Sequence, residues 1–524
     1  MRQHAGGNPS AGALRALGLA LSLPALALVG GCATFQEMEP PTLRDQVESI
    51  VFAPPLDQVN WGIQIVDPER GQILYSHNAH RKFVPASNMK ILSTAAALVL
   101  LGPEYRYETE VWGVGTLEPG AGVLHGDLVL RATGDPTFSK RFYPSAEAAL
   151  DSLAQGLWAA GVRRVTGSLI VDVSAWDSTT VPGTWMVANL PGTSAATGGA
   201  FSIAEGELTL EVTAGSRPGE PARVRWWPGT DDDFFTATFA TAHPDSTARA
   251  RRTDFFPETK RLRMEGRIPA GSVDTIRVAQ REPVPVASTA LMRALERRGI
   301  QVLEGLRISW DAGDPAGPGP CVTGHPRPDR PATATFVPDC PGAFRLARLT
   351  SPTLAEIVKA ILEPSQNWMT EQLVKTLGSE LGEEGSWSEG FRIQEEFFVQ
   401  EVGVDSLDIA YRDGSGLSAY NLVTPRALVR MLDYMRRSPH AGLYRNAMAS
   451  PGEDGSTLRT RLLELDNRVF AKTGTITHVN SLSGYLVTDG GKELIFSILT
   501  NGSGLPSGSI RSAIDRIVMV TARQ

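Results

Sequence analysis

The sequence has little cysteine and histidine and no long run of basic residues. Three cysteines and eight histidines occur among 524 residues, and the pattern His-Glu-x-x-His is absent. That pattern is how a common class of zinc peptidase binds its metal, so a metallopeptidase is not expected. Fifty Lys and Arg residues against 57 Asp and Glu give a net charge of −7. We therefore expect no metal, no cofactor and no nucleic-acid partner.

Internal repeats and low-complexity tracts are also missing. Hydrophobic residues make up 42% of the chain and charged residues 20%, which argues against collagen, bulk disorder and a polytopic membrane protein. At about 150 residues per domain, the length predicts three to four domains. The Gly-x-Ser-x-Gly pattern of α/β-hydrolases does not occur.

The first 31 residues have the character of an export signal. They contain Arg2 and Arg15, no acidic residue, and an apolar stretch that is too short to span a bilayer. The small residues before Cys32 resemble the lipobox at which bacterial prolipoproteins are acylated and cleaved. An ordinary signal peptide with an incidental cysteine is the alternative. We expect residues 1–31 to be a lipoprotein signal peptide and Cys32 to carry the lipid.

The mature chain is expected to begin with a short Pro-containing tether at residues 32–43. Ala33, in place of Asp, suggests sorting to the outer membrane, so we expect a lipid-anchored envelope protein that faces the periplasm. The other two cysteines, Cys321 and Cys340, lie in one loop rich in Pro and Gly. In an oxidising compartment such a pair indicates a structural disulfide, worth about 3 kcal/mol by loop entropy.

Helix and strand signals divide the mature chain into an α/β (α+β) part and a β-rich inserted region. The first part, an antiparallel sheet flanked by helices, is expected to comprise residues 44–110 and 344–524. Its predicted helices are 87–101, 354–362, 369–377, 391–402, 425–437 and 509–521, and its predicted strands are 60–75, 469–473, 483–488 and 493–500. The insert at residues 111–343 is expected to contain one helix at 288–298 and strands at 123–132, 165–173, 208–212, 223–227 and 272–278.

A Ser-x-x-Lys motif starts the first of these helices. Residues i and i+3 are neighbours on one helix face, so the amine of Lys90 can reach the hydroxyl of Ser87. A serine is a weak nucleophile until a base takes its proton, and a lysine serves as that base when burial or a neighbouring cation lowers its pKa. Alone, the pattern is weak, because about one or two chance matches are expected and an exposed helix start explains each.

A Ser-x-Asn triplet lies at a predicted turn between two helices. Ser365 and Asn367 would project from this turn, because Pro364 precedes them and the next helical run begins directly after them. An ordinary helix cap explains the same residue types, since Ser and Asn both cap well.

A Lys-Thr-Gly motif ends a predicted strand. Lys472 offers a cation to an anionic substrate group, and the hydroxyls of Thr473 and Thr475 can bind the same group. Gly474 lets a ligand approach the backbone closely. The alternative is that the motif has only a structural role, as a strand end followed by a turn.

The three motifs together are specific, because they fall in this order in helix-start, turn and strand contexts. The sequence resembles the low-molecular-mass penicillin-binding proteins of the S13 peptidase family, which are D-alanyl-D-alanine carboxypeptidases and endopeptidases. Residues 134–137 (Gly-Asp-Pro-Thr) and 413–418 (Asp-Gly-Ser-Gly-Leu-Ser) look like further family landmarks. The resemblance implies a β-lactamase/transpeptidase-like catalytic domain, peptidoglycan stem peptides as substrates and β-lactams as inhibitors.

The resemblance also implies a role for each site residue. Ser87 would attack the carbonyl of a D-Ala-D-Xaa bond, with Lys90 as proton acceptor, and Ser365 would relay a proton to the leaving amine. The backbone N–H groups of Ser87 and Thr475 would form the oxyanion hole. Asn367 would hold the substrate amide and Lys90. The terminal carboxylate would be held by Lys472 and Thr473, so the expected substrate-binding set is Asn367, Lys472, Thr473, Gly474 and Thr475.

One residue departs from the S13 pattern. Ala419 stands where many members carry a basic residue that binds the side-chain carboxylate of diaminopimelate, which puts a preference for that group in doubt. Two rival functions remain. A β-lactamase or esterase of the same fold is one, although no Glu-x-x-Leu-Asn segment supplies a deacylating base. A non-catalytic peptidoglycan-binding lipoprotein is the other, and it would be expected to have lost Ser87, Lys90 or Lys472.

Overall fold

The computed structural model describes residues 41–228, 235–246, 251–256, 258–310 and 342–524. Cys32, Cys321 and Cys340 lie outside these ranges, as does the expected signal peptide, so the lipid anchor and the disulfide stay predictions. Within the described ranges, no helix is both long and apolar enough to cross a membrane.

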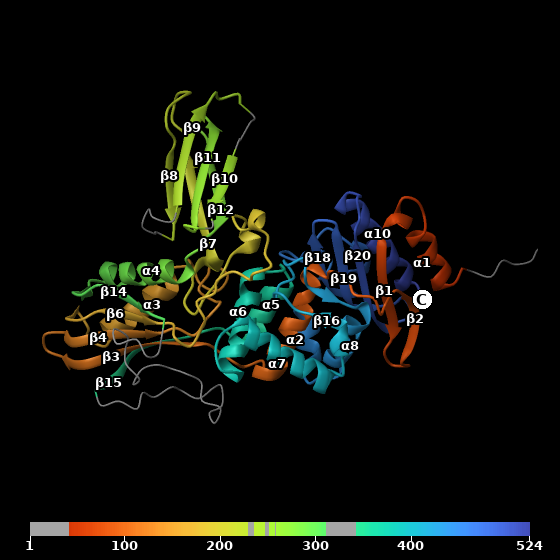
Figure 1. Ribbon diagram of the computed structural model, residues 1–524, viewed down its shortest axis with the longest axis horizontal. Helices are drawn as coiled ribbons and strands as arrows, with labels where there is room; N and C mark the ends of the chain where they lie inside the picture. Colours follow the sequence, from red (N-terminus) through yellow and green to blue (C-terminus); the bar gives the residue numbers. More distant parts are fainter. Residues whose placement is uncertain (1–40, 229–234, 247–250, 257, 311–341) are drawn as a thin grey trace, which may run out of the picture. The chain divides into compact units, whose positions relative to one another are not determined.

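The two ends of the chain build one five-stranded sheet (Figure 1). In spatial order its strands are β18 (Val469–Ile476), β19 (Val479–Val487), β20 (Glu493–Asn501), β1 (Asn60–Asp67) and β2 (Gln72–His77). Every neighbouring pair is antiparallel, so the expected antiparallel sheet is confirmed. Helices α1 (Leu43–Val51) and α10 (Ser507–Ala522) share a hydrophobic core with one face of this sheet.

A layer of helices covers the opposite face. It contains α2 (Met89–Leu101), α5 (Leu354–Leu362), α6 (Asn367–Leu381), α7 (Trp387–Phe397) and α8 (Pro425–Arg437). Tyr485, Ile495 and Leu499 reach from the sheet into a second core, which it shares with these helices. Helix α2 is buried on all sides from Met89 to Leu98 because α5, α6 and α8 surround it. This buried helix carries the Ser-x-x-Lys lysine.

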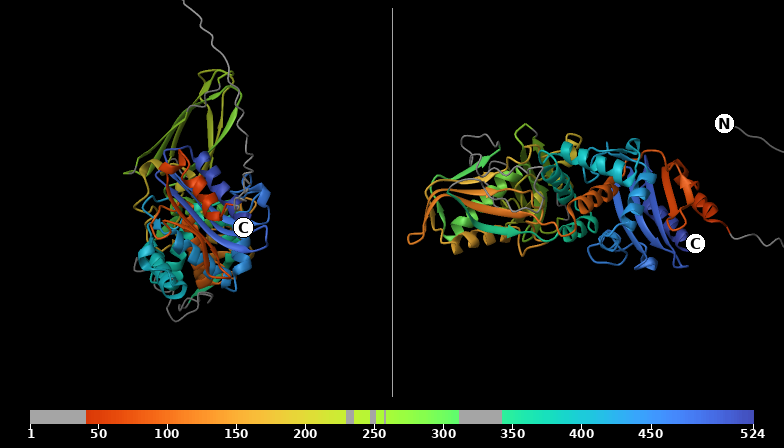
Figure 2. Two further views of the ribbon diagram at one scale, coloured as in Figure 1. Left: turned by 90° about the vertical axis from the view of Figure 1, so that its right-hand side faces the viewer. Right: turned by 90° about the horizontal axis from the view of Figure 1, so that it is seen from below.

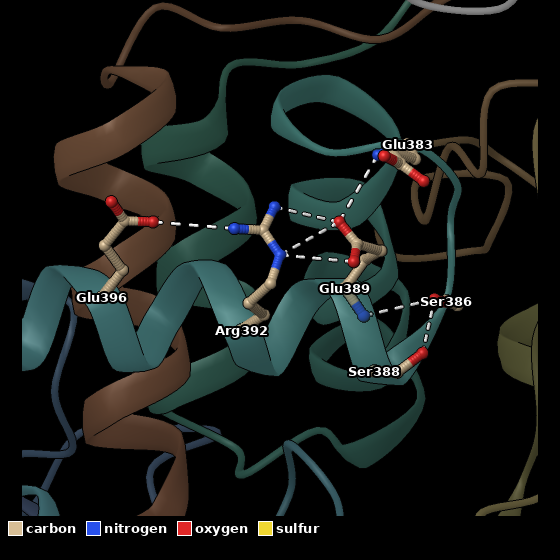
Figure 3. A network of polar contacts seen from close by, with 6 residues as sticks. All are labelled: Glu383, Ser386, Ser388, Glu389, Arg392 and Glu396. Carbon is tan, nitrogen blue, oxygen red and sulfur yellow. Dashed lines mark hydrogen bonds and ion pairs between the residues drawn. The ribbon is translucent and has the colours of Figure 1, made fainter.

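Figure 3 shows the polar network on the exposed side of α7. The Ser386 hydroxyl accepts a hydrogen bond from the backbone N–H of Glu389 at 3.2 Å and so caps the helix. Arg392 forms ion pairs with Glu389 at 3.0 Å and Glu396 at 3.6 Å, one helical turn to each side. These contacts hold the first turn of α7, from which Trp387 points back toward α6.

The described residues between 108 and 350 form a larger mixed sheet and two small sheets. The larger sheet is formed by β3 (Glu108–Glu118), β4 (Val123–Arg131), β5 (Arg164–Val165), β6 (Leu169–Asp172), β13 (Gln301–Val302), β14 (Leu306–Ser309) and β15 (Ala343–Thr350). Helices α3 (Ala148–Ala159) and α4 (Pro283–Arg298) pack on it around a third core (Figures 1 and 2). The small sheets, β12-β7-β8 and β10-β11-β9, enclose a fourth core with apolar side chains from both. Their strands are β7 (Glu207–Thr213), β8 (Arg223–Trp227), β9 (Phe235–Ala242), β10 (Arg251–Phe256), β11 (Arg261–Pro269) and β12 (Val273–Ala279).

Most predicted elements coincide with observed ones, and the exceptions are instructive. The helices expected at 354–362 and 425–437 match α5 and α8. Helix α4 begins five residues before the expected start, and α1, α3, β3, β9, β10, β11 and β15 were not expected. The division into catalytic and inserted domains stays a prediction. Strands β3 and β15 pair with each other. Strand β3 begins two residues before residue 110, where the first catalytic segment is expected to end, and β15 begins at residue 343, where the insert is expected to end.

Candidate active site

Ser87 and Lys90 lie at the junction between a short 3-10 turn, Ala86–Asn88, and α2. The Lys90 Nζ lies 3.0 Å from the Ser87 hydroxyl, 2.6 Å from the Asn367 carbonyl oxygen and 2.7 Å from the backbone carbonyl of Ser415. An ammonium group has three hydrogens, so each has an acceptor here. Ser87 is half-buried, whereas Lys90 is fully buried. The turn therefore presents the hydroxyl and encloses the amine.

Burial changes the proton affinity of this amine. It lowers the pKa of Lys90 from 10.5 to about 7, although the carboxylates of Glu371 and Asp413 oppose the change. The same burial, with the charge of Lys90, lowers the pKa of Lys472 well below its usual value. A lysine with a pKa near neutral pH can accept and return a proton within one catalytic cycle.

The Ser-x-Asn triplet lies where the turn after α5 leads into α6: Ser365 is in the turn, and Asn367 is the first residue of the helix. Asn367 accepts from Lys90 and donates its side-chain N–H to the backbone carbonyl of Ser194 at 2.7 Å. The alternative that Ser365 or Asn367 caps the helix is wrong, because the side chain of Gln366 accepts from Met369 N at 3.0 Å. Ser365 is half-buried and has a left-handed backbone, with φ of 66°.

The Lys-Thr-Gly motif lies on β18, the edge strand beside the Ser87 turn. Asn88 donates its side-chain N–H to the backbone carbonyl of Lys472 at 2.8 Å, which joins the turn to the strand. Gly474 permits this approach, because a Cβ there would lie 2.9 Å from Pro85 O and 3.0 Å from Ser87 N. The buried Lys472 amine donates to the carbonyl of Thr473 at 2.9 Å.

The threonines of this motif differ in their surroundings. The Thr473 hydroxyl lies 2.8 Å from that of Thr457 on the neighbouring loop, while Thr475 is exposed and its hydroxyl donates to the carbonyl of Gly474. The structure thus brings Ser87, Lys90 and Asn367 into direct contact and places Lys472–Thr475 beside them. Ser365 lies in the same turn as Asn367.

A model of the D-Ala-D-Ala carboxypeptidase 3 (S13) family matches residues 43–315 and 335–524. The chain belongs to this family. The D-alanyl-D-alanine carboxypeptidase of Actinomadura sp. (strain R39) is 31% identical over 479 residues, which is 89% of this chain and 82% of that protein. The carboxypeptidase DacB of Haemophilus influenzae is 21% identical over 469 residues, 88% of this chain and 89% of that one.

A solved structure has the same fold. The crystal structure of penicillin binding protein 4 (dacB) from Haemophilus influenzae aligns with a TM-score of 0.74 at 20% identity, covering 91% of this chain and 99% of that chain. The predicted S13 family, mixed α/β fold class and carboxypeptidase class of enzyme are confirmed. Within the described residues, no group of three His, Cys, Asp or Glu side chains is placed to hold a metal ion.

The segment expected to form the insert also contributes to this S13 site. Besides Ser194, it supplies Trp185, whose indole N–H donates to the Asp413 carboxylate at 2.8 Å. It also supplies Thr184, whose hydroxyl lies 2.8 Å from that of Ser418. Nothing in the local sequence of the insert pointed to these residues, because their partners lie 173 to 234 positions away.

The landmark segment at residues 413–418 lies directly against the nucleophile turn. Gly416 has φ of 84°, and a Cβ there would overlap the carbonyl of Ala86 at 1.8 Å. Arg412, at the start of the segment, is exposed and donates to its neighbouring carbonyl, Tyr411 O, at 2.6 Å. Sequence reasoning also missed Glu371, although its spacing of four from Asn367 puts both on one face of α6.

Proposed function

We propose that the protein hydrolyses the D-Ala-D-Xaa peptide bond of peptidoglycan stem peptides through an acyl-enzyme on Ser87. The observation that carries this assignment is the 3.0 Å separation of the Ser87 hydroxyl from a buried amine, Lys90, whose pKa is about 7. A neutral amine at that distance can take the hydroxyl proton as the oxygen attacks.

The proposed reaction has two halves. Ser87 Oγ bonds to the carbonyl carbon, its proton passes to Lys90 Nζ, and the negative oxygen is held by the backbone N–H groups of Ser87 and Thr475. The C–N bond then breaks, and the proton that Lys90 gained passes by way of Ser365 to the leaving amine, which leaves Lys90 neutral. In the second half water attacks the ester carbonyl and its proton passes to Lys90. As the ester C–O bond breaks, Lys90 returns this proton to Ser87 Oγ, which restores both residues.

Lys472 and Thr473 are proposed to bind the terminal carboxylate of the substrate. A carboxylate beside the buried Lys472 amine favours its charged form, against the effect of burial. Because each buried lysine disfavours the charge of the other, a charged Lys472 also favours neutral Lys90. Substrate binding would thus prepare the base.

A labelled β-lactam tests the assignment. Penicillin binding protein 4 of Haemophilus influenzae has also been solved in complex with a β-lactam, which supports β-lactams as inhibitors here. Purified protein should be labelled by a fluorescent penicillin and release D-Ala from a stem pentapeptide, and S87A should do neither while keeping the wild-type thermal unfolding curve. Label transfer or wild-type D-Ala release by S87A would contradict it. Rapid turnover of the penicillin would instead favour a β-lactamase.

We also propose that the mature protein begins at an acylated Cys32 and is anchored in the bacterial envelope, facing the periplasm. The small residues before Cys32 support this proposal. The mass of the N-terminal peptide from membrane fractions tests it: a diacyl or triacyl modification on Cys32 is expected. An unmodified N-terminus, or release of wild-type protein into the soluble fraction like C32A, would contradict it.

A further inference from the structure

Residues 414 and 415 are clamped between α2 and α6. Their backbone N–H groups donate to the carboxylate of Glu371 on α6, Gly414 at 3.0 Å and Ser415 at 2.8 Å. Their carbonyls accept from α2: Gly414 O from the Ser93 hydroxyl at 2.9 Å and Ser415 O from the Lys90 amine at 2.7 Å. Two consecutive residues, Gly414 and Ser415, therefore connect a buried carboxylate with the amine beside Ser87.

Hydrogen bonds fix the Glu371 carboxylate in position to contact residues 414 and 415. Its side chain is 2% exposed, and besides the two backbone donors its carboxylate accepts the indole N–H of Trp387 at 2.8 Å. Trp387 is the first residue of α7, the helix capped by Ser386 (Figure 3). Three N–H donors offset much of the cost of burying a carboxylate.

Asp413, the neighbouring buried carboxylate, has a different task. Its two oxygens accept from the backbone N–H groups of Gly416 and Ser418 and from the side chains of Asn421 and Trp185. Asp413 therefore shapes the segment internally and ties it to the insert. The contact between this segment and α6 is made by Glu371.

We propose that Glu371 is a positioning residue for Lys90, which orients the Ser415 carbonyl toward the amine and balances the charge that the amine gains when it takes the Ser87 proton. The proposal rests on the proposed function, in which Lys90 is the base. Without Glu371, the Ser415 N–H would lose its partner on α6 and the Ser415 residue its fixed orientation, and Lys90 would lose a nearby negative charge.

The charged groups around Lys90 give the sign of the electrostatic effect. Glu371 faces it from α6, Asp413 from the 413–418 segment and Lys472 from β18, while its contacts Ser87 and Asn367 are neutral. Both carboxylates raise the pKa of Lys90 against the effect of burial. Burial and the charge of Asp413 in turn raise the pKa of Glu371 to about 7. Removing the charge of Glu371 takes away one of the two effects that raise the pKa of Lys90, so the pKa of Lys90 must fall further.

The test is the pH profile of acylation by a fluorescent penicillin in E371Q. An amide has one acceptor oxygen where the carboxylate has two, so at least one of the three buried donors loses its partner. We expect the maximal rate to fall about tenfold or more. We also expect the midpoint of the acid limb to move to lower pH, because the base loses its proton more readily.

E380Q is the matched control. Glu380 is a half-buried carboxylate on the same helix, and its described hydrogen bond, from the Tyr105 hydroxyl at 3.1 Å, can be kept by an amide. Its profile should match wild type. E371D keeps the charge but shortens the reach, so its midpoint should stay near wild type while its rate falls.

The outcomes separate the proposals. If acylation by E371Q is slower but the midpoint of its acid limb is unchanged, Glu371 has only a structural role. If the whole pH profile matches wild type, Glu371 has no role in acylation. Either result overturns the inference. If E371Q does not fold, the E371D profile decides: a wild-type rate would overturn the inference. Labelling that persists in S87A would instead refute the proposed function.

Discussion

Replacing Gly474 by alanine tests whether β18 must lie as close to the nucleophile turn as it does. The added Cβ would lie 2.2 Å from the Ser481 hydroxyl, 2.9 Å from Pro85 O and 3.0 Å from Ser87 N. The Ser481 hydroxyl can rotate away, at the cost of its 2.7 Å hydrogen bond to Pro85 O. The two backbone atoms can move only if the turn that carries Ser87 moves.

The expected effect follows from these overlaps. Overpacking of this size costs about 1–3 kcal/mol of stability, and a shift approaching ~1 Å at a reacting group costs up to about a hundredfold in rate. We expect acylation of G474A by a fluorescent penicillin to be slower by about tenfold to a hundredfold. The time course of labelling, with the melting temperature measured in parallel, gives both quantities.

Two further variants make this result interpretable. G504A is the control, because a Cβ at Gly504 meets nothing within 4 Å, and it should label like wild type. Adding S481A to G474A removes the closest overlap but leaves both backbone overlaps, so it should restore only part of the rate. Labelling of folded G474A at the wild-type rate would refute the reasoning, since β18 could then move back without harm to the site.

Three other predictions follow from the same geometry. In K472A, the KM for a stem pentapeptide should rise and kcat should fall, with kcat/KM reduced at least about tenfold, because a carboxylate contact persists in the transition state; an unchanged KM would contradict carboxylate binding by Lys472. In W185F, the Asp413 carboxylate loses the indole N–H as a donor, so the free energy of unfolding should fall by about 1–2 kcal/mol and acylation should slow. W310F is the control: its indole is 41% exposed, and neither quantity should change. In wild type, acylation should rise with pH through about 7, since Lys90 must be neutral to take the proton; a flat profile from about pH 5 to 9 would exclude Lys90 as the base.

Local signals in the sequence were enough for the elements that frame the site. Helix α8 begins at Pro425 after the cap Thr424, and its apolar residues recur at helical spacing, so both its bounds were predictable. The order of the three motifs was enough to indicate the family. Helix α1 was not predicted, although the capping box of Thr42 and Asp45 marks its start in the sequence.

Only the tertiary structure decided what surrounds the reactive groups. The pKa of Lys90 depends on burial by three helices and on two carboxylates about 280 to 320 positions away, and no local pattern encodes that distance in space. Strand β15 pairs with β3 across more than 200 residues, and Ser194 of the insert meets Asn367 of α6 for the same reason. Local sequence specifies which atoms are available for catalysis, whereas long-range packing determines which of them meet and how much water and charge they retain.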